Sequence, residues 1–535
     1  MRSPLRLPAI GRSASDRLSP LLFLGLMLGL LLSELDQNIF ATALPTIVGE
    51  LHGVDRMLWV TTAYVLTSTL TMPIYGKLGD LLGRKVMFVA ALVLFVLGSV
   101  IGGLAPDMTW LIVARAVQGL GGGGLLILVQ AIVADLVPAR ERPLYMSVVG
   151  AVFALSAVLG PVLGGWLTET VGWRWAFWVN LPRGGLAIVV AVTLLRLPPR
   201  SVDRVRVDVW GITTLALAVS ALVLLSTWGG TRYPWSSPVT LSLAATAAVA
   251  VVAFVLVERR AAEPVIGLHL FRERNFTATT LAGLVLAVAM FGAIAYLPTY
   301  LQMVHGLSPT HAGYVMLSLM AGIALTTIGS AQVVARTGRY RWLPVIGALL
   351  TAAALAWMST LGVDTSLVAI GGYLFLLGAG IGCTVEILVV IVQNTFPESE
   401  VGTATAANSF FREIGVALGS AVVGTLFTSR LATLLAERVP AGASVTRSAG
   451  PAADQVPGEP VDVLGLTPAA VRLLPPDLHA AVVSSYNDAL TPVFLLLLPL
   501  VLLSVVGLCL IRPLPLATTV GEPATTDSQP AGRPR

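Results

Sequence analysis

Residues 20–44 read PLLFLGLMLGLLLSELDQNIFATAL, a stretch long and apolar enough to decide the class of fold. About 20 mostly apolar residues span a bilayer as a helix. Two carboxylates, Glu34 and Asp36, interrupt this stretch. An acid at the centre of a spanning helix costs about 2.5–3.5 kcal/mol on insertion scales, and such groups are usually kept because they serve a function. The stretch therefore predicts a membrane-spanning helix that carries a functional acid.

The composition of the whole chain also indicates a membrane protein. Of its 535 residues, 56% are hydrophobic and 11% are charged, whereas soluble domains carry roughly 25% charged residues. The two cysteines, Cys383 and Cys509, lie in apolar runs without a CxxC or Cys/His cluster, which argues against a disulfide or a metal site. The sequence also shows no nucleophile–base set and no phosphate-binding loop, so neither an enzyme nor an ATP-driven pump is expected.

Fourteen segments are long and apolar enough to be membrane spans. Their orientation follows from the connecting loops, because cytoplasmic loops are enriched in Lys and Arg. With a cytoplasmic N-terminus, the short outer loops hold only Arg56, Arg174 and Arg232, and the inner loops hold the other loop cations. Both termini are therefore expected on the cytoplasmic side of the cytoplasmic membrane. The spans centre on residues 20–44, 57–76, 86–105, 109–134, 144–167, 176–196, 208–228, 238–257, 276–299, 311–334, 342–361, 366–393, 404–429 and 490–511.

The segments outside the spans are expected to be irregular. A cytoplasmic arm, residues 1–19, precedes a first span that is too long for a signal-peptide core and is expected to stay uncleaved. The one long loop, residues 430–489, would lie outside the cell and is rich in Pro, Ala, Gly and Ser, which favours a mobile segment. Within it, residues 467–490 are compatible with short helices. A cytoplasmic tail, residues 513–535, is expected to be disordered after Pro515.

The loop GKLGDLLGRK, residues 76–85, combines glycines with an acid and a basic pair. Gly76 and Gly83 allow helix ends to approach closely. Asp80 can form a switchable ion pair with Arg84 or Lys85. This pattern predicts a conformational latch. The ordinary enrichment of cytoplasmic loops in basic residues explains Lys85 but not the spacing of the glycines.

A degenerate copy of this loop occurs in the second half of the chain, as GSAQVVARTGRYR at residues 329–341. Gly338 and Arg339 correspond to the Gly-Arg pair of the first loop, but Ala335 stands where the first loop has its acid. Two related halves around a central cavity are typical of secondary transporters.

At these residues the chain resembles the major facilitator superfamily, specifically its fourteen-span drug:proton antiporter family. The chain departs from the family pattern at Gln37, Asn38 and Arg183. Four motifs carry the resemblance, and a fifth segment is typical of the fourteen-span branch: LDQNIFATALP (35–45), GKLGDLLGRK (76–85), RAVQGLGGG (115–123), GPVLGG (160–165) and WRWAFWVNLP (173–182).

The resemblance implies an all-α integral membrane protein with the major facilitator fold. Two six-helix halves, residues 20–200 and 275–512, would flank two additional central helices at 208–257, which gives fourteen transmembrane helices. In this family the halves rock about a midplane cavity and exchange an exported compound for an entering proton. Such a carrier needs no cofactor beyond the proton gradient. Its partners would be protons, small amphiphiles and the bilayer, with no nucleic acid and no obligate protein partner.

Four charged residues inside the spans are candidates for proton coupling or for binding a cationic cargo. Asp36 lies past the midplane of the first span, and Arg115 needs a partner because a permanent cation in a span is costly. Glu34 lies about 200° from Asp36 around the helix, so it must face a different surface. Glu386 interrupts GCTVEILVVIVQ with no charge within one helical turn, which favours a second proton or cation site. Arg412 and Glu413 are interpreted as a structural salt bridge.

Two further features concern helix packing. Gly160, Pro161, Gly164 and Gly165 break and thin the fifth span, and small residues permit close helix packing. The resemblance implies that they form the antiporter motif. The Trp residues of the neighbouring segments are expected to form an interfacial belt: Trp166, Trp173, Trp175 and Trp178.

The leading hypothesis is proton-coupled export of amphipathic, often cationic, drugs or metabolites by alternating access, which would confer antibiotic resistance. Export of a self-made metabolite or of a lipid remains open. Uptake, as in fourteen-span peptide transporters, is disfavoured because their ExxER pattern is absent at Glu34. A membrane receptor with a transporter fold is the alternative from another class, and the motif loop and the intramembrane acids count against it.

Overall fold

The computed structural model describes residues 19–53, 56–197, 207–230, 232–438 and 468–517. In these ranges the regular structure is helical, with no β-strand. Thirteen helices are long and apolar enough to cross a membrane, and the apolar helix Trp342–Met358 is slightly shorter. The predicted all-helical membrane fold is confirmed, and the count of fourteen spans is consistent with the structure. The expected arm and tail fall largely outside the described ranges.

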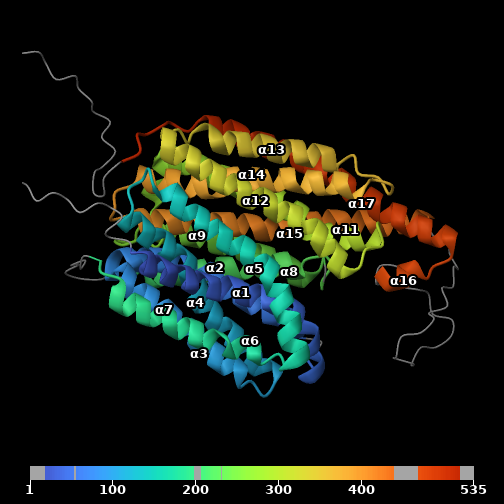
Figure 1. The fold of residues 1–535 in the computed structure, drawn as a ribbon, viewed down its shortest axis with the longest axis horizontal. Helices are drawn as coiled ribbons and strands as arrows, with labels where there is room; N and C mark the ends of the chain where they lie inside the picture. The colour runs from blue at the N-terminus through green and yellow to red at the C-terminus, as the bar shows by residue number, and fades with distance from the viewer. Residues whose placement is uncertain (1–18, 54–55, 198–206, 231, 439–467, 518–535) are drawn as a thin grey trace, which may run out of the picture.

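The first half of the chain forms one bundle, which we call the N-half (Figure 1). Its sixth span is divided near Val179 into two helices. The helices are α1 (Pro20–Glu50), α2 (Met57–Leu82), α3 (Arg84–Gly103), α4 (Met108–Leu136), α5 (Arg142–Thr170), α6 (Trp175–Trp178) and α7 (Asn180–Leu194).

The second bundle, the C-half, repeats this plan. Its first span is divided at Tyr296. The helices are α10 (Arg274–Ala295), α11 (Leu297–Met303), α12 (Pro309–Thr337), α13 (Trp342–Met358), α14 (Leu367–Thr395), α15 (Val401–Arg438), α16 (Pro468–Arg472) and α17 (Pro476–Cys509), preceded by the 3-10 helix η3 (Leu268–Arg272).

The predicted outer loop is shorter than expected, because helices extend into it from both ends. α15 continues to Arg438, and α17 already begins at Pro476. The expected range of 430–489 therefore loses about two helical turns at its start and about four at its end, and the compatible short helix appears as α16. Residues 439–467 lie outside the described ranges.

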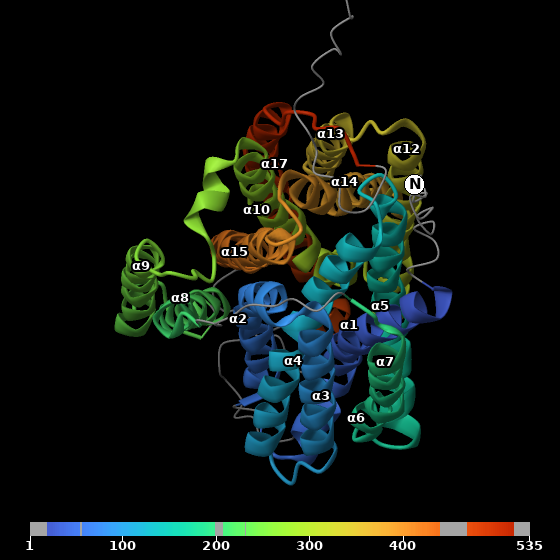
Figure 2. The same cartoon turned by 90° about the vertical axis from the view of Figure 1, so that its left-hand side faces the viewer.

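The two additional helices, α8 (Val209–Trp228) and α9 (Pro238–Glu258), are central in the sequence but peripheral in space. Figure 2 shows them at the side of the bundle, with α8 next to α2 and α9 outermost. α8 packs against α2 of the N-half and α15 of the C-half. Val249 and Val252 of α9 are 68% and 59% exposed, as expected for a lipid-facing helix.

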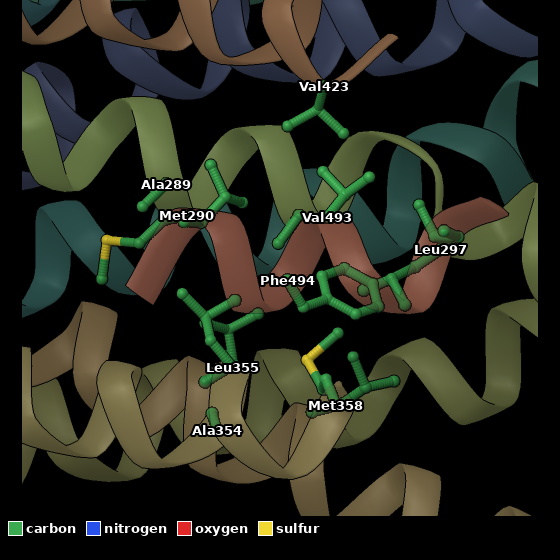
Figure 3. Packing of buried hydrophobic residues seen from close by; sticks show 14 of the residues in the cluster. Ala289, Met290, Leu297, Ala354, Leu355, Met358, Val423, Val493 and Phe494 are labelled. Atoms are coloured by element: carbon green, nitrogen blue, oxygen red, sulfur yellow. The ribbon is translucent and has the colours of Figure 1, made fainter. Parts of the chain in front are cut away.

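Each half has its own apolar core. In the C-half, Phe494 of α17 belongs to one cluster with Met290 of α10 and Leu355 of α13, and Figure 3 shows these side chains between the helices. In the N-half, Phe88 and Phe95 of α3 are fully buried in the corresponding cluster. Most of each core lies within one half, but the two halves also share buried contacts. Val390 of α14 joins the N-half cluster, and Met72, Ile127 and Ala406 form a small cluster across the interface.

Candidate transport site

The predicted latch residue Asp80 bridges the two halves at the end of the bundle where α2 ends and α15 begins. We call this end, with residues 76–86 and 393–403, the latch end. The Asp80 carboxylate accepts from the backbone N–H groups of Gly402 (3.3 Å) and Thr403 (2.7 Å) and from the Thr403 hydroxyl (2.9 Å). These N–H groups lie in the first turn of α15, where a helix lacks internal acceptors and favours an anion. The carboxylate thus caps a helix of the opposite half.

Arg84 holds this carboxylate in place. It is 2% exposed and donates to Asp80 at 3.0 Å, and it also forms an ion pair with Asp135 at 2.5 Å. The same guanidinium donates to the Glu398 carbonyl of the C-half at 3.2 Å. Asp80 and Arg84 therefore both contribute to the contact between the halves.

The glycines of the loop have separate uses. A Cβ on Gly76 would lie 2.8 Å from the Gly402 carbonyl oxygen, so this glycine lets α2 approach α15. Gly83 has φ +97°, a left-handed conformation that glycine adopts without strain. Lys85 does not contribute to the contact between halves, since it donates to the Val192 carbonyl of its own half at 2.7 Å.

Asp36 lies at the centre of a buried polar network inside the N-half. Its side chain is 0% exposed and forms an ion pair with Arg115 of α4, which is 2% exposed. Asp36 also accepts from the Asn180 amide at 2.7 Å and from the Gln118 amide at 3.1 Å. Three donors from two other helices therefore satisfy the carboxylate, which explains how a full charge is tolerated at this depth.

Further neighbours fix the geometry of this network. The side-chain oxygen of Gln118, Oε1, accepts from Arg115 at 2.9 Å, and its side-chain nitrogen, Nε2, also donates to the Ser99 hydroxyl of α3 at 2.9 Å. The Arg115 guanidinium lies over the rings of Phe40 and Tyr64, with Cζ 4.4 and 4.3 Å from the ring centroids. Aromatic faces stabilise a desolvated cation. The pair is therefore held by α1, α2, α3, α4 and α7.

Arg183, a departure from the family pattern, acts at the edge of the network. Its guanidinium donates to the side-chain amide oxygen of Asn180, Oδ1, at 3.1 Å. Because that oxygen is occupied, the Asn180 amide nitrogen is the group directed at Asp36.

Glu34 and Glu386 belong to a second group of charges, away from Asp36. Glu386 is 8% exposed, and its Oε2 is buried without a hydrogen-bond partner in the described part of the chain. It lies at the interface of the halves, where a Cβ on Gly150 of α5 would be 3.9 Å from its side chain. Arg412 of α15 interacts electrostatically with Glu34, Glu386 and Glu413. These four residues are called the central charge group below.

The predicted salt bridge between Arg412 and Glu413 is not formed. Adjacent residues on a helix point about 100° apart, which separates their side chains. Across the described ranges, no hydrogen bond or ion pair joins the Arg412 side chain to another residue. It instead lines a cavity of about 20 Å³ together with Asn408 and Thr384 and the apolar side chains of Met290 and Phe291.

The GPVLGG segment packs α5 against α1. A Cβ on Gly160 would lie 3.0 Å from the Asn38 backbone, and one on Gly164 would lie 2.7 Å from the Ile39 carbonyl oxygen. A Cβ on Gly165 would meet no atom of the described residues within 4 Å. Pro161 lies within the helix and is exposed. Gly160 and Gly164 therefore permit the close approach, and Gly165 does not contribute to it.

The predicted tryptophan belt is wrong for Trp173, which is buried at 2% exposure and donates to Glu50 at 2.8 Å. Trp166 and Trp175 are 57% and 50% exposed, as a belt requires. Trp173 follows Gly172, whose φ of +94° turns the chain back over the end of the N-half.

The four predicted coupling residues thus occupy two places. Asp36 and Arg115 meet inside the N-half, whereas Glu34 and Glu386 lie with Arg412 nearer the interface. Gln118, Asn180 and Ser99 were missed. The first two lie inside the recognised motifs RAVQGLGGG and WRWAFWVNLP, so a polar residue within an apolar motif was the available signal.

Comparison with known proteins identifies the family. The sequence profile described as Major Facilitator Superfamily matches residues 26–420. An uncharacterised MFS-type transporter of Mycobacterium tuberculosis is 38% identical over 540 residues, covering 100% of this chain and 76% of that protein. The multidrug transporter protein MdtP of Bacillus subtilis is 34% identical, covering 94% of both chains.

Two further matches agree with this assignment. Multidrug resistance protein 3 of Bacillus subtilis is 33% identical, covering 90% of this chain and 93% of that protein. The crystal structure of the human organic anion transporter MFSD10 (TETRAN) superposes with a TM-score of 0.59 at 17% identity, covering 90% of this chain and 100% of the other, which supports the fold alone. The chain therefore belongs to the Major Facilitator Superfamily and is a multi-pass membrane transporter rather than an enzyme.

Proposed function

We propose that this transporter is a proton-coupled antiporter that exports amphipathic, mainly cationic, compounds across the cytoplasmic membrane. The observation that carries the proposal is the separation of its buried acids into two groups. One acid is sealed within the N-half and paired with an arginine, and the others lie near the interface of the halves. A coupled exchanger needs a place for the proton and a place for the cargo.

Asp36 is the proposed proton site. Protonation would remove the charge that holds Arg115 and would replace an acceptor by a donor toward the Gln118 and Asn180 amides. The network would have to rearrange, because a buried guanidinium without its counter-ion is strongly destabilised. A change at α1, α4 and α7 is thereby linked to binding of one proton.

The central charge group is the proposed cargo site. Glu34 comes from the N-half, whereas Glu386 and Glu413 come from the C-half, so a bound cation would contact both halves. Met290 and Phe291 provide apolar walls in the adjacent cavity. At about 20 Å³ this cavity would have to widen, by separation of the halves, before it could take the non-polar part of an amphiphile. Arg412 would neutralise the acids when no cargo is bound, since it interacts electrostatically with all three and forms no hydrogen bond or ion pair with any described residue.

The latch end is the proposed cytoplasmic end. The positive-inside rule supports this orientation, because this end carries Lys77, Arg84, Lys85 and Arg140. Closure of the latch on the cytoplasmic side is the arrangement expected when cargo leaves toward the outside. The relatives with multidrug names support export of several compounds, and a role in antibiotic resistance would follow from it.

The test uses the purified protein in liposomes with an imposed proton gradient. A monovalent and a divalent cationic dye are offered, and dye and internal pH are followed together. We expect dye movement that requires the gradient and a proton flux in the opposite direction. Asp36→Asn should abolish accumulation driven by the gradient but retain dye exchange without it. The proposal fails if no cationic dye moves, or if a protonophore leaves accumulation unchanged.

A further inference from the structure

The latch end contains a second contact between the halves, centred on Arg140. This residue precedes α5 and belongs to the N-half. Its Nε donates to the Ala335 carbonyl at 3.0 Å, and a terminal nitrogen donates to the Arg336 carbonyl at 2.9 Å. Its backbone N–H donates to the Ala517 carbonyl at 3.2 Å. All three acceptors belong to the C-half.

The two acceptors on α12 are unsatisfied carbonyls of its last turn. α12 ends at Thr337, and Gly338 terminates it in a left-handed conformation with φ +70°. The last four carbonyls of a helix have no internal donor and form the negative end of the helix dipole. A guanidinium at this position satisfies two of them and neutralises the dipole, so Arg140 caps a helix of the opposite half.

This contact is the counterpart of the Asp80 latch in the internal repeat. α2 packs on α15, and α12 packs on α5. Asp80, near the end of α2, caps the positive N-terminus of α15. Arg140, before α5, caps the negative C-terminus of α12. Ala335 is the position that the sequence repeat aligns with Asp80, and here a backbone carbonyl, rather than a carboxylate, is the acceptor.

The segment after α17 runs across the same end of the molecule. Asn275 exchanges two hydrogen bonds with Arg512, at 2.9 and 2.8 Å. The Tyr340 hydroxyl bonds to the carbonyl and the N–H of Leu514, at 2.9 and 2.7 Å. The backbone of two residues, Arg512 and Leu514, is thus fixed before the chain reaches Arg140. Residues 510–517 are called the strap.

The strap touches both halves. Asn394 of the C-half donates to the Pro515 carbonyl at 3.2 Å. Leu516 packs against the apolar clusters of the C-half and the N-half. Disorder is expected after Pro515, but the chain is held in place by these contacts as far as Ala517.

We propose that Arg140 and the strap form a second latch, which must open together with the Asp80 latch before the latch end can separate. The two latches oppose the same movement through different helix pairs. Loss of either one should shift the molecule toward the conformation that is open at this end. The inference concerns the conformational equilibrium alone and does not depend on which cargo or ion is transported.

The test measures the distance between the halves directly. Spin labels are attached at Val86 and Arg339, which are exposed residues of the N-half and the C-half at the latch end, after Cys383 and Cys509 have been replaced by serine. Distance distributions are recorded for the full chain in lipid nanodiscs. Wild type should give mainly the short distance. Arg140→Gln should raise the ratio of long to short distances by about tenfold, because charge-assisted hydrogen bonds are lost.

Three further variants make the result specific. Tyr340→Phe removes both hydroxyl bonds to the strap at nearly constant shape and should give a smaller shift in the same direction. Arg140→Lys keeps the charge and a donor and should restore most of the short distance. Arg336→Gln is the matched control, because the carbonyl of this residue accepts the bond and its side chain is exposed.

Two outcomes would overturn the second latch. In the first, Asp80→Asn lengthens the distance while Arg140→Gln and Tyr340→Phe behave as wild type, which would leave a single latch. In the second, Arg336→Gln shifts the distribution as much as Arg140→Gln, which would attribute the effect to loss of positive charge in general.

Discussion

Asp36 and Glu386 are both carboxylates deep in the bundle, yet their surroundings differ. Asp36 is fully buried and accepts from Arg115, Gln118 and Asn180. Glu386 is 8% exposed and has one oxygen with no partner among the described residues. The first acid is saturated within one half of the molecule. The second retains binding capacity at the interface between the halves.

The difference shows that depth in the membrane does not by itself assign a role to an acid. A saturated buried ion pair stabilises one arrangement of helices, and it resists change until its charge is altered. An unsaturated buried oxygen costs free energy until a proton or a cation satisfies it. Substitutions at the two places should therefore fail in different ways, in stability for the first and in cargo binding for the second.

Arg115→Ala should have the largest effect, because it leaves Asp36 as a buried charge without a counter-ion. Breaking such a pair costs about 3–5 kcal/mol. We expect a marked fall in the unfolding temperature in detergent and complete loss of efflux. The double variant Asp36→Asn/Arg115→Gln, in which neutral amides replace both charges, should regain much of the stability but no efflux driven by the proton gradient. Arg339→Gln, at an exposed position, is the control and should match wild type.

A finding that Arg115→Ala unfolds at the wild-type temperature would break the comparison, since Asp36 would then not depend on its partner. Stability lost equally in the single and the double variants would point to the contacts of Arg115 with Phe40 and Tyr64 as the source instead.

Gly164→Ala should have the next largest effect, because α1 carries acids of both groups on different faces and packs on α5 through this glycine. The added methyl would lie 2.7 Å from the Ile39 carbonyl oxygen. Overpacking of this kind costs about 1–3 kcal/mol. Gly165→Ala is a matched control, since its methyl would meet nothing within 4 Å. Thermal unfolding and initial efflux rates of the two variants should separate clearly, and equal values would remove the special status of Gly164.

Sequence reasoning identified the fold and the charges of both groups because an ionised residue in an apolar run is conspicuous. It identified Asp36, Arg115 and Glu386 for this reason. It also singled out Asp80, which the structure places in a contact between the halves, since the enrichment of cytoplasmic loops in basic residues does not produce the glycine spacing around this residue. The sequence did not show which of these charges form pairs, because Asp36 and its partner Arg115 on α4 are 79 residues apart in the chain.

The misses have physical reasons as well. Asn180 and Ser99 are uncharged, and such residues often serve only to bond a carbonyl in the preceding turn of their own helix. Arg412 and Glu413 were paired because they are adjacent, although adjacency on a helix separates side chains by about 100°. Trp173 was placed at the membrane interface from its residue type, while the turn at Gly172 buries it.

Glu386→Gln should leave stability unchanged, or raise it slightly, and should weaken cargo binding. The substitution replaces a carboxylate that has an unsatisfied oxygen by a neutral amide, and the free energy of burying an amide is lower than that of burying a charge. Loss of one partly screened charge contact is worth about 1 kcal/mol, which is roughly fivefold in affinity. The divalent dye should be affected more than the monovalent one. Glu34→Gln should follow the same pattern more weakly, because its side chain is less buried.

The measurement is the concentration dependence of initial efflux for both dyes, with the membrane level of each variant determined in parallel. Equal losses for the two dyes would argue against an electrostatic role for Glu386. A fall in unfolding temperature as large as that of Arg115→Ala would place Glu386 in the same class as Asp36 and break the comparison.

Glu50→Gln should have the smallest effect, and it tests burial alone. Glu50 lies on α1 beyond the membrane-spanning part, Pro20–Phe40, and accepts from Arg174 at 2.5 Å and from Trp173 at 2.8 Å. Like Asp36, it has an arginine partner and a further N–H donor. Its side chain is 51% exposed, however, and that of Arg174 is 37% exposed. Exposed ion pairs contribute about 0–1 kcal/mol, because water and salt screen them.

The hydrogen bonds from Arg174 and then Trp173 hold the pKa of Glu50 below its ordinary value of 4.5. A lowered carboxyl pKa adds stability that is present above pH 4.5 and is lost as pH falls through the folded-state value. The unfolding temperature of Glu50→Gln should therefore lie only slightly below that of wild type at neutral pH, and the two should converge in acid. Added salt should reduce the difference at neutral pH, since the pair is open to solvent. A loss at neutral pH as large as that of Arg115→Ala, or one that persists in acid, would mean that the arrangement of donors, rather than burial, sets the strength of both carboxylate–arginine pairs.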